Sequence, residues 1–239
     1  MQDIYVYGTI GEDWGECTTA KEFANQMKEA GDGPVTVHIN SCGGSVWDAS
    51  AMADTIAAHK GRVEARIEGL AASAASYFAL TADSVTMADT ALLMIHNPSC
   101  GAFGEAGELR KTADLLDKVR GTIVSRYVGK TGLNEAEVGT LMDDETWFTA
   151  DEAKEMGFVD AIEDMPAVTN QLDPAVSDSW SHRPDGLSGE REVKPACSVE
   201  PGCGATGEPA ANIGGDSKAP RLVCVNGKFL RFRDKGSKE

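Results

Sequence analysis

The sequence contains no apolar stretch long enough to cross a membrane. A transmembrane helix needs about 18 or more consecutive apolar residues, and no such run occurs among the 239 residues of the chain. The opening residues Met1–Ile4 also lack the basic and apolar regions of a signal peptide. We therefore expect a protein of the cytoplasm that has no membrane partner.

Cysteine is also sparse. The six cysteines are scattered along the chain, and a protein without an export signal normally keeps its thiols reduced, so we expect no disulfide. Cys197 and Cys203 are further apart than the paired cysteines of most zinc sites, and His182 is the one histidine near them. The sequence therefore predicts neither a metal site nor a cofactor.

Positive charge is scarce relative to negative charge. The chain carries 22 Lys and Arg against 38 Asp and Glu, which gives a formal net charge of -16 at pH 7. Because this charge repels phosphate backbones, we expect no nucleic-acid partner for the main body. A hydrophobic content of 41% and a charged content of 25% are ordinary for a globular protein and argue against wholesale disorder.

Short β-branched runs alternate with alanine-rich stretches from Ile4 to about Met165. This alternation is typical of parallel strands joined by helices, so the predicted fold class is α/β. Strands are expected at 4–9, 35–39, 63–67, 84–87 and 91–95, and helices at 18–30, 46–60, 73–80, 105–128, 134–141 and 150–156. In the longest helix, Gly121 costs about 1 kcal/mol relative to Ala and predicts a bend or a close contact. Gly129 and Gly132 are expected to end that helix.

The composition changes after Met165. Seven of the nine prolines and a single aromatic residue, Trp180, fall between residues 166 and 220, so this stretch cannot pack a core. Beyond it, apolar residues alternate around Asn226 and Gly227, which is a strong hairpin signal. We expect three parts: an α/β domain at 1–165, a flexible Pro/Gly-rich linker at 166–220, and a basic tail with a small β-hairpin at 221–239.

A pair of glycines, Gly43 and Gly44, follows the strand expected at 35–39. Without a Cβ atom, these residues permit unusual backbone dihedrals and let a substrate approach, so their N–H groups can point at a carbonyl oxygen. Such a pair is also common in ordinary strand-to-helix turns. The glycines alone do not identify a site.

Ser73 lies among small residues, in the segment Gly69-Leu-Ala-Ala-Ser-Ala-Ala-Ser76. A serine at a helix N-terminus is close to N–H donors and to the positive end of the helix dipole, both of which stabilise an oxyanion. An N-cap serine gives the same pattern without any chemistry. This motif by itself leaves both interpretations open.

His96 follows an apolar strand, in the segment Leu93-Met-Ile-His-Asn-Pro98. The carboxyl ends of strands are where α/β sheets place their ligands. A histidine at such a position is also often structural. The other histidines, His38, His59 and His182, are interpreted as structural or solvated.

Taken in order, the glycine pair, the serine and the histidine resemble the motifs of the ClpP serine peptidase family. The resemblance extends from about Ile4 to Val159, with Cys42 in place of the family's usual proline. It implies a ClpP/crotonase-like fold, a repeated ββα superhelix with helix 105–128 as its long handle. The opening strand and the segment 145–148 look most similar to the phage-encoded branch that is associated with head maturation.

The resemblance also implies a role for each motif. Ser73 is the expected nucleophile of a serine endopeptidase, and His96 is its general base. The N–H groups of Gly44 and Ala74 are expected to form the oxyanion hole.

The third member of the triad is left open by the sequence. The family has an aspartate two positions before an aromatic residue, and matching that aromatic to Phe148 places Thr146 there. Either the Thr146 hydroxyl orients His96, or a neighbouring carboxylate turns inward. The candidate carboxylates are Asp143, Asp144 and Glu145.

Partners follow from the same resemblance. It implies polypeptide substrates, cleaved through an acyl-enzyme with or without the help of an ATP-driven unfoldase. It also implies a homo-oligomeric ring, single or stacked, with phage head proteins as partners if the chain acts in an immature head in the host cytoplasm.

Two other functions are considered. A crotonase-type acyl-CoA enzyme is disfavoured because such enzymes need neither Ser73 nor His96, and because the acidic body has no basic cluster for the acyl-CoA phosphates. A catalytically weak or inactive assembly protein would suit the missing aspartate, the proline-rich linker and the basic tail. Retention of the serine, the histidine and both glycines argues against that second alternative.

Overall fold

The computed structural model describes residues 1–11, 17–164 and 180–182, and two further strands. The chain divides into two compact units, Met1–Gly189 and Glu190–Glu239. In the second unit, β9 (Leu222–Val225) pairs antiparallel with β10 (Lys228–Arg231), one on each side of the predicted hairpin turn. Apart from Trp180–His182 and these strands, the predicted linker and tail lie outside the described residues.

The first unit is built on one eight-stranded sheet of order β2-β1-β3-β4-β5-β8, in which β6 pairs with both β4 and β7. Its strands are β1 (Gln2–Ile10), β2 (Cys17–Thr18), β3 (Val35–Gly44), β4 (Val63–Ala72), β5 (Ser84–Ala88), β6 (Leu92–Ile95), β7 (Thr146–Phe148) and β8 (Ala161–Glu163). Paired strands are parallel except β6 and β7, which are antiparallel. The predicted α/β class is therefore confirmed.

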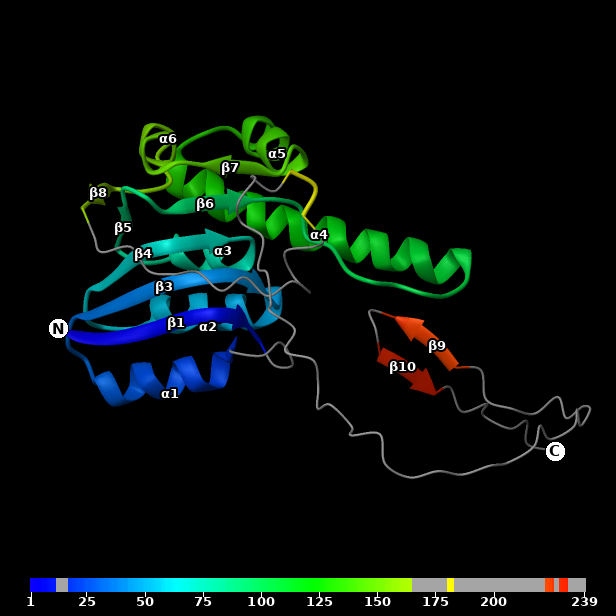
Figure 1. Ribbon diagram of the computed structural model, residues 1–239, viewed down its shortest axis with the longest axis horizontal. Coiled ribbons are helices and arrows are strands. Elements are labelled where there is room, and N and C mark those ends of the chain that lie inside the picture. The colour runs from blue at the N-terminus through cyan, green and yellow to red at the C-terminus, as the bar shows by residue number, and fades with distance from the viewer. Residues whose placement is uncertain (12–16, 165–179, 183–221, 226–227, 232–239) are drawn as a thin grey trace, which may run out of the picture. The chain divides into compact units, whose positions relative to one another are not determined.

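Helices connect these strands. They are α1 (Ala20–Ala30), α2 (Val46–Ala58), α3 (Ala74–Ala79), α4 (Ala106–Thr131), α5 (Glu135–Asp143) and α6 (Ala150–Glu155). Figure 1 shows α1 and α2 beside the blue strands β1 and β3, and α4 extending away from the sheet. Among the described helices, none combines the length and the hydropathy that a membrane span requires.

The core of the first unit lies between the sheet and its helices. The apolar side chains of β3 that face this core are fully buried and occupy every second position, so they share one face of the sheet. These side chains are Val35, Val37 and Ile39. Phe23 of α1 and Phe78 of α3 meet edge-on within this core, with ring centroids 5.3 Å apart. Burying an aromatic side chain of this kind contributes roughly 1.5–3 kcal/mol, so these contacts fix α3 against the sheet.

Two central strands are longer than the sequence predicted. β3 continues to Gly44 rather than ending at Ile39, and β4 continues to Ala72 rather than ending at Ile67. Neighbouring strands supply pairing partners for the extra residues, because β1 pairs with the end of β3 and β6 with the end of β4. The glycine pair and the residue before Ser73 are therefore parts of the sheet.

The long helix also differs from the prediction. α4 continues through Gly129, and Gly132 ends it in the left-handed conformation with φ 76°. The predicted close contact at Gly121 is wrong, since a Cβ atom there would meet nothing within 4 Å, and α4 runs continuously through this residue. Buried Ile123 and Tyr127 anchor this part of α4, and such packing outweighs the weak helix propensity of glycine.

Candidate active site

Ser73 occupies a sharp turn between β4 and α3. Its φ is 55° and its ψ is -122°, an uncommon conformation for a residue other than glycine. The turn is held by its own backbone, because the Ser73 N–H donates to the Met94 carbonyl at 2.9 Å. Although Ser73 is the N-cap of α3, its side chain makes no capping hydrogen bond. The hydroxyl is therefore available to the neighbouring histidine.

His96 follows β6 and meets the serine directly. The distance between His96 Nε2 and Ser73 Oγ is 2.8 Å, within hydrogen-bonding range. Burial lowers the pKa of His96 below its ordinary value, and the nearby Glu145 carboxylate acts in the opposite direction. The ring is thus mostly neutral near pH 7, which is the form that can accept a proton from the serine.

The glycine pair lies against the serine turn. A Cβ atom built on Gly43 would come within 2.9 Å of Ser73 Cβ and 2.9 Å of the Ala74 nitrogen. Ala74 is the first residue of α3, so its N–H has no acceptor within the helix. Gly44 lines a cleft of about 340 Å³ together with Ser73, Ala74 and His96. The structure thus brings four of the predicted site residues to one cleft.

Thr146 does not contact the histidine. Its hydroxyl donates to the Leu141 carbonyl at 2.7 Å, which uses the hydroxyl proton within the α5–β7 turn. Asp143 is also directed elsewhere, because its carboxylate accepts hydrogen bonds from Asn97 at 2.8 Å and from Arg120 at 3.0 Å. Asp144 is exposed at the end of α5. Within the described residues, no hydrogen bond joins His96 Nδ1 to any of these side chains.

Among the candidates for the residue that orients His96, Glu145 is the one next to the histidine in the sheet. The antiparallel ladder of β6 and β7 places Ile95 opposite Thr146, so the next residues outward are His96 and Glu145. Glu145 is 7% exposed and has a left-handed φ of 49°. Had the family's aromatic been matched to Trp147 instead of Phe148, the expected aspartate would have fallen at Glu145. This shift of the match by one residue is the signal in the sequence that could have identified Glu145.

A segment of the predicted linker lies beside the site. Trp180 is buried, packs edge-on against Trp147 at 5.2 Å, and lines the same cleft as Ser73 and His96. The two backbone N–H groups that follow it donate to the Glu145 carboxylate. This contact could not be predicted, because a lone aromatic residue among prolines carries no periodic pattern.

Two buried hydroxyl groups, those of Ser76 and Tyr127, are hydrogen-bonded to each other and to the turn that carries Ser73. Ser76 Oγ donates to the Ser73 carbonyl at 2.7 Å and lies 2.8 Å from the Tyr127 hydroxyl. Because Ser76 has one hydroxyl proton, Tyr127 must be the donor to it. Burial raises the pKa of Tyr127, which keeps this donor protonated.

Replacing Tyr127 by phenylalanine should therefore loosen the turn. We expect Tyr127→Phe to lower the free energy of unfolding by about 1 kcal/mol and to slow reaction at Ser73 severalfold. The measurements are urea unfolding and covalent labelling of the serine. Tyr77→Phe is the matched control, because the Tyr77 hydroxyl has no hydrogen bond among the described residues. Equal effects in both variants would contradict the interpretation.

The fold and the site together define a class: an α/β protein with a serine–histidine pair where the strands of a parallel sheet end. A sequence profile described as Clp protease matches residues 3–165. The chain is 37% identical over 133 residues to the ATP-dependent Clp protease proteolytic subunit 1 of Chlamydia abortus, covering 54% of this chain and 69% of that protein. The chain therefore belongs to the Clp protease family.

Further relatives agree with this membership. Over 130 residues the chain is 32% identical to proteolytic subunit 3 of Streptomyces coelicolor, a match that covers 54% of this chain and 60% of that protein. A solved structure of a ClpP1 mutant from Listeria monocytogenes matches with a TM-score of 0.60 at 25% identity, covering 69% of this chain and 92% of that one. The predicted ClpP-like fold is confirmed.

Proposed function

We propose that this chain is a serine-type endopeptidase of the ClpP type that cleaves polypeptides through an acyl-enzyme on Ser73. The observation that carries the proposal is the 2.8 Å contact between His96 Nε2 and the hydroxyl of a serine in a strained strand-to-helix turn. A serine of ordinary pKa is a weak nucleophile and needs such a base. Capping serines, by contrast, bond the backbone of their own helix.

The proposed mechanism is acyl transfer. His96 accepts the proton of Ser73 while Oγ attacks the peptide carbonyl, and the N–H groups of Gly44 and Ala74 hold the oxyanion. Collapse of the tetrahedral intermediate expels the amine, which takes the proton back from His96. Water then attacks the acyl-enzyme by the same route and restores the free serine.

We assign the third position of the triad to Glu145 in place of Thr146. Glu145 is a buried carboxylate next to His96, and its negative charge favours the imidazolium that forms during the reaction. The Thr146 hydroxyl already has an acceptor in the Leu141 carbonyl. A hydroxyl also carries no negative charge with which to balance the imidazolium.

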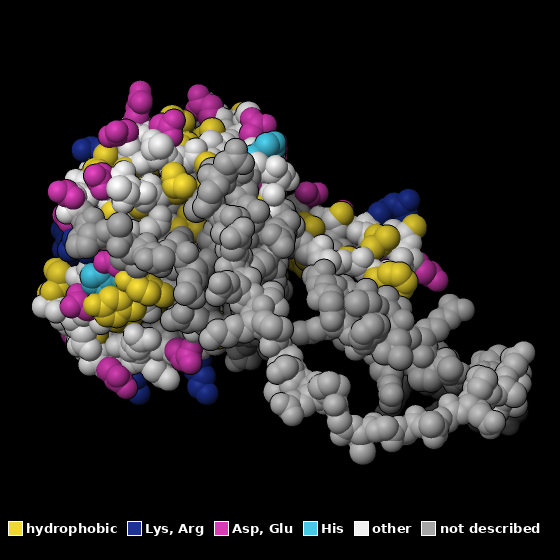
Figure 2. Space-filling view, in the orientation of Figure 1, with side chains coloured by type: hydrophobic (Ala, Val, Ile, Leu, Met, Phe, Trp, Pro, Cys, Tyr) yellow, Lys and Arg dark blue, Asp and Glu magenta, His cyan; other side chains and the backbone are white. Residues whose placement is uncertain are grey.

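A homo-oligomeric ring is part of the proposal. α4 carries exposed apolar side chains, Leu109 at 42% and Leu115 at 49%, with Phe103 at 90% in the loop before it. Figure 2 shows hydrophobic side chains along the projecting part of this helix. Exposed apolar surface of this kind favours contact with another copy. On the resemblance alone, we propose that the chain acts in phage head maturation with phage head proteins as partners, either independently of ATP or with the help of an unfoldase.

The alternative of an inactive assembly protein makes a different prediction about the serine. The deciding experiment is labelling of the purified full-length chain with a fluorophosphonate, followed by mass spectrometry to locate the adduct. The probe phosphonylates an activated serine and loses fluoride, so an adduct on Ser73 supports the peptidase. An assembled oligomer in which Ser73 stays unlabelled would favour the assembly role and refute the proposal.

The pH dependence of labelling follows from the state of His96. The base must be neutral, and burial holds its pKa below the ordinary value of 6.5. As pH falls, the neutral form is lost only when pH passes this lowered pKa. We therefore expect the labelling rate at pH 6.5 to be more than half of its plateau value, and its midpoint to lie below pH 6.5. A midpoint of the pH profile above pH 6.5 would contradict the assignment of the buried His96 imidazole as the general base.

Two neighbouring variants test the third residue. Glu145→Gln should slow labelling of Ser73 roughly tenfold to a hundredfold, because the imidazolium loses its counter-charge. Thr146→Val should leave the rate within about threefold and cost about 1 kcal/mol of stability, through the lost bond to Leu141. Rates of labelling and urea unfolding measure both. The reverse order of effects would return the role to Thr146.

A further inference from the structure

The segment Trp180–His182 closes one side of the cleft that holds Ser73 and His96. The Trp180 side chain is 8% exposed and meets Trp147 of β7 with ring centroids 5.2 Å apart. It also packs on a small apolar cluster, separate from the main core, formed by Cys42, Leu70, Ala72 and Met94. Burial of an indole gives the segment a stable position beside the catalytic pair.

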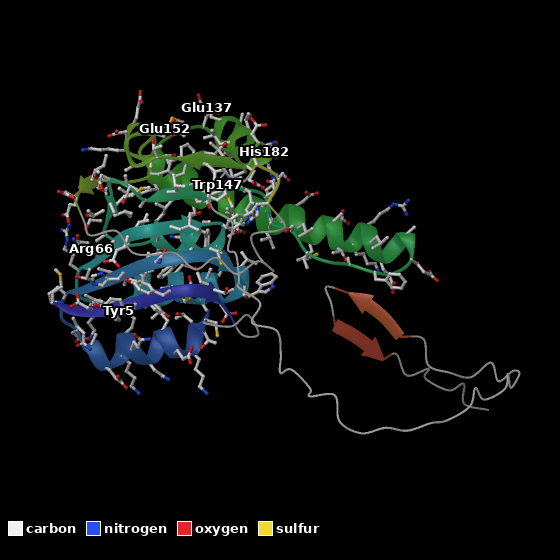
Figure 3. All side chains as sticks on the ribbon, viewed as in Figure 1. Tyr5, Arg66, Glu137, Trp147, Glu152 and His182 are labelled. Atoms are coloured by element: carbon white, nitrogen blue, oxygen red, sulfur yellow. The ribbon has the colours of Figure 1, made fainter. Side chains whose placement is uncertain are left out.

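The Glu145 carboxylate accepts hydrogen bonds from the backbone of the same segment. One carboxylate oxygen accepts the N–H of Ser181 at 2.6 Å, and the other accepts the N–H of His182 at 2.7 Å. Figure 3 shows His182 and Trp147 near one another at this end of the sheet. Hydrogen bonds from backbone N–H groups to a carboxylate are among the strong ones. Both oxygens of a buried carboxylate are thus engaged by the segment.

The same carboxylate lies next to His96, as the register of β6 and β7 requires. A carboxylate that accepts the Nδ1–H of a catalytic histidine fixes the tautomer and the orientation of the ring. With its oxygens directed to Ser181 and His182, Glu145 makes no such bond in this structure. The backbone of the segment and the imidazole of the base are therefore two possible sets of donors to the Glu145 carboxylate, and in this structure its hydrogen bonds go to the segment.

We propose that Trp180–His182 is an intramolecular latch, which slows the peptidase by retaining Glu145 and by occupying the cleft with the Trp180 ring. This inference rests on the proposed function, since it concerns control of that same site. Displacement of the segment by an incoming polypeptide frees the carboxylate to accept the Nδ1–H of His96. The chain would then become most active when its cleft is filled by substrate instead of by its own segment.

The central test compares proline with alanine at one position of the full-length chain. Ser181→Pro removes the N–H that Glu145 accepts, whereas Ser181→Ala removes the hydroxyl and keeps the N–H. The loss of one hydrogen bond to a charged group favours the released state about tenfold or more. We therefore expect Ser181→Pro to accelerate fluorophosphonate labelling of Ser73 about tenfold, and Ser181→Ala to label at the wild-type rate.

A second pair of variants tests the ring. Trp180→Ala removes the side chain that seats the segment and should accelerate labelling in the same direction. Tyr5→Ala is its control, because Tyr5 is an aromatic residue that is 52% exposed and does not line the cleft. Adding Glu145→Gln to Trp180→Ala should abolish the gain, since no carboxylate remains to serve His96.

The outcomes separate the latch from the proposed function. A variant that merely folds poorly labels more slowly, which is opposite to the expected change. Equal labelling rates in the wild type, Ser181→Pro and Trp180→Ala would overturn the latch while leaving the peptidase assignment standing. If Ser73 is labelled in none of the variants, the proposed function itself fails and the latch fails with it.

Discussion

Replacing Ser73 by alanine is expected to abolish hydrolysis of an unfolded polypeptide, lowering kcat/KM by roughly 10⁴-fold or more. The reason is that the acyl-enzyme cannot form without Oγ. His96→Ala should cost a similar factor, and the double variant should be no worse than either single one, because the two side chains act as a unit. The measurement is the release of a fluorescent fragment from a quenched polypeptide by the full-length chain.

The fold of the Ser73→Ala variant should be unchanged. Ser73 holds its turn through its backbone N–H and carbonyl, both of which alanine retains, and its hydroxyl contributes one bond, to His96. Urea unfolding should therefore match the wild type within about 1 kcal/mol. Ser125→Ala is a suitable control, since the Ser125 hydroxyl bonds its own helix at Gly121. Hydrolysis that survives Ser73→Ala would show that another residue is the nucleophile.

The α/β fold could be predicted because its signals are local. Alternation of β-branched strands with alanine-rich helices reflects how parallel strands must be connected, and apolar and polar residues alternate along the central strands, as expected where one face of a strand packs on the core. The strand ends could not be predicted in this way. Gly43, Gly44 and Ala72 have poor strand propensity, and they belong to strands because neighbouring strands pair with them.

The site was predictable only in part. The glycines end one strand, and Ser73 and His96 each follow another, so the topology of a parallel sheet brings them to one edge. The partner of the histidine depends on a single-residue register across β6 and β7, which a short polar segment does not fix. The contact between Trp180 and Trp147 joins distant parts of the chain, and no local pattern could have revealed it.

The glycine pair should be as sensitive as the catalytic residues. Gly43 has a φ of +86°, and a Cβ atom there would lie 2.6 Å from the Ala72 carbonyl oxygen and 2.9 Å from the Ala74 nitrogen. These are backbone atoms of the turn that carries Ser73, so they can move only by moving the nucleophile. Gly43→Ala should therefore lower the free energy of unfolding by about 2–4 kcal/mol, from overpacking and backbone strain together.

The displacement of the Ser73 turn should lower the labelling rate of Gly43→Ala more than the loss of stability does. A misplacement of about 1 Å between reacting groups can slow a reaction roughly 10²-fold, so the Gly43→Ala protein that remains folded should label at Ser73 about a hundredfold more slowly. Gly132→Ala separates backbone strain from contact with the serine turn. Gly132 also has a positive φ, +76°, but nothing lies within 4 Å of the added Cβ atom. It should lose about 1 kcal/mol of stability and label at the wild-type rate. If both variants label equally, then left-handed strain and not contact with the serine turn explains the glycine, and Gly43 has no part in positioning the nucleophile.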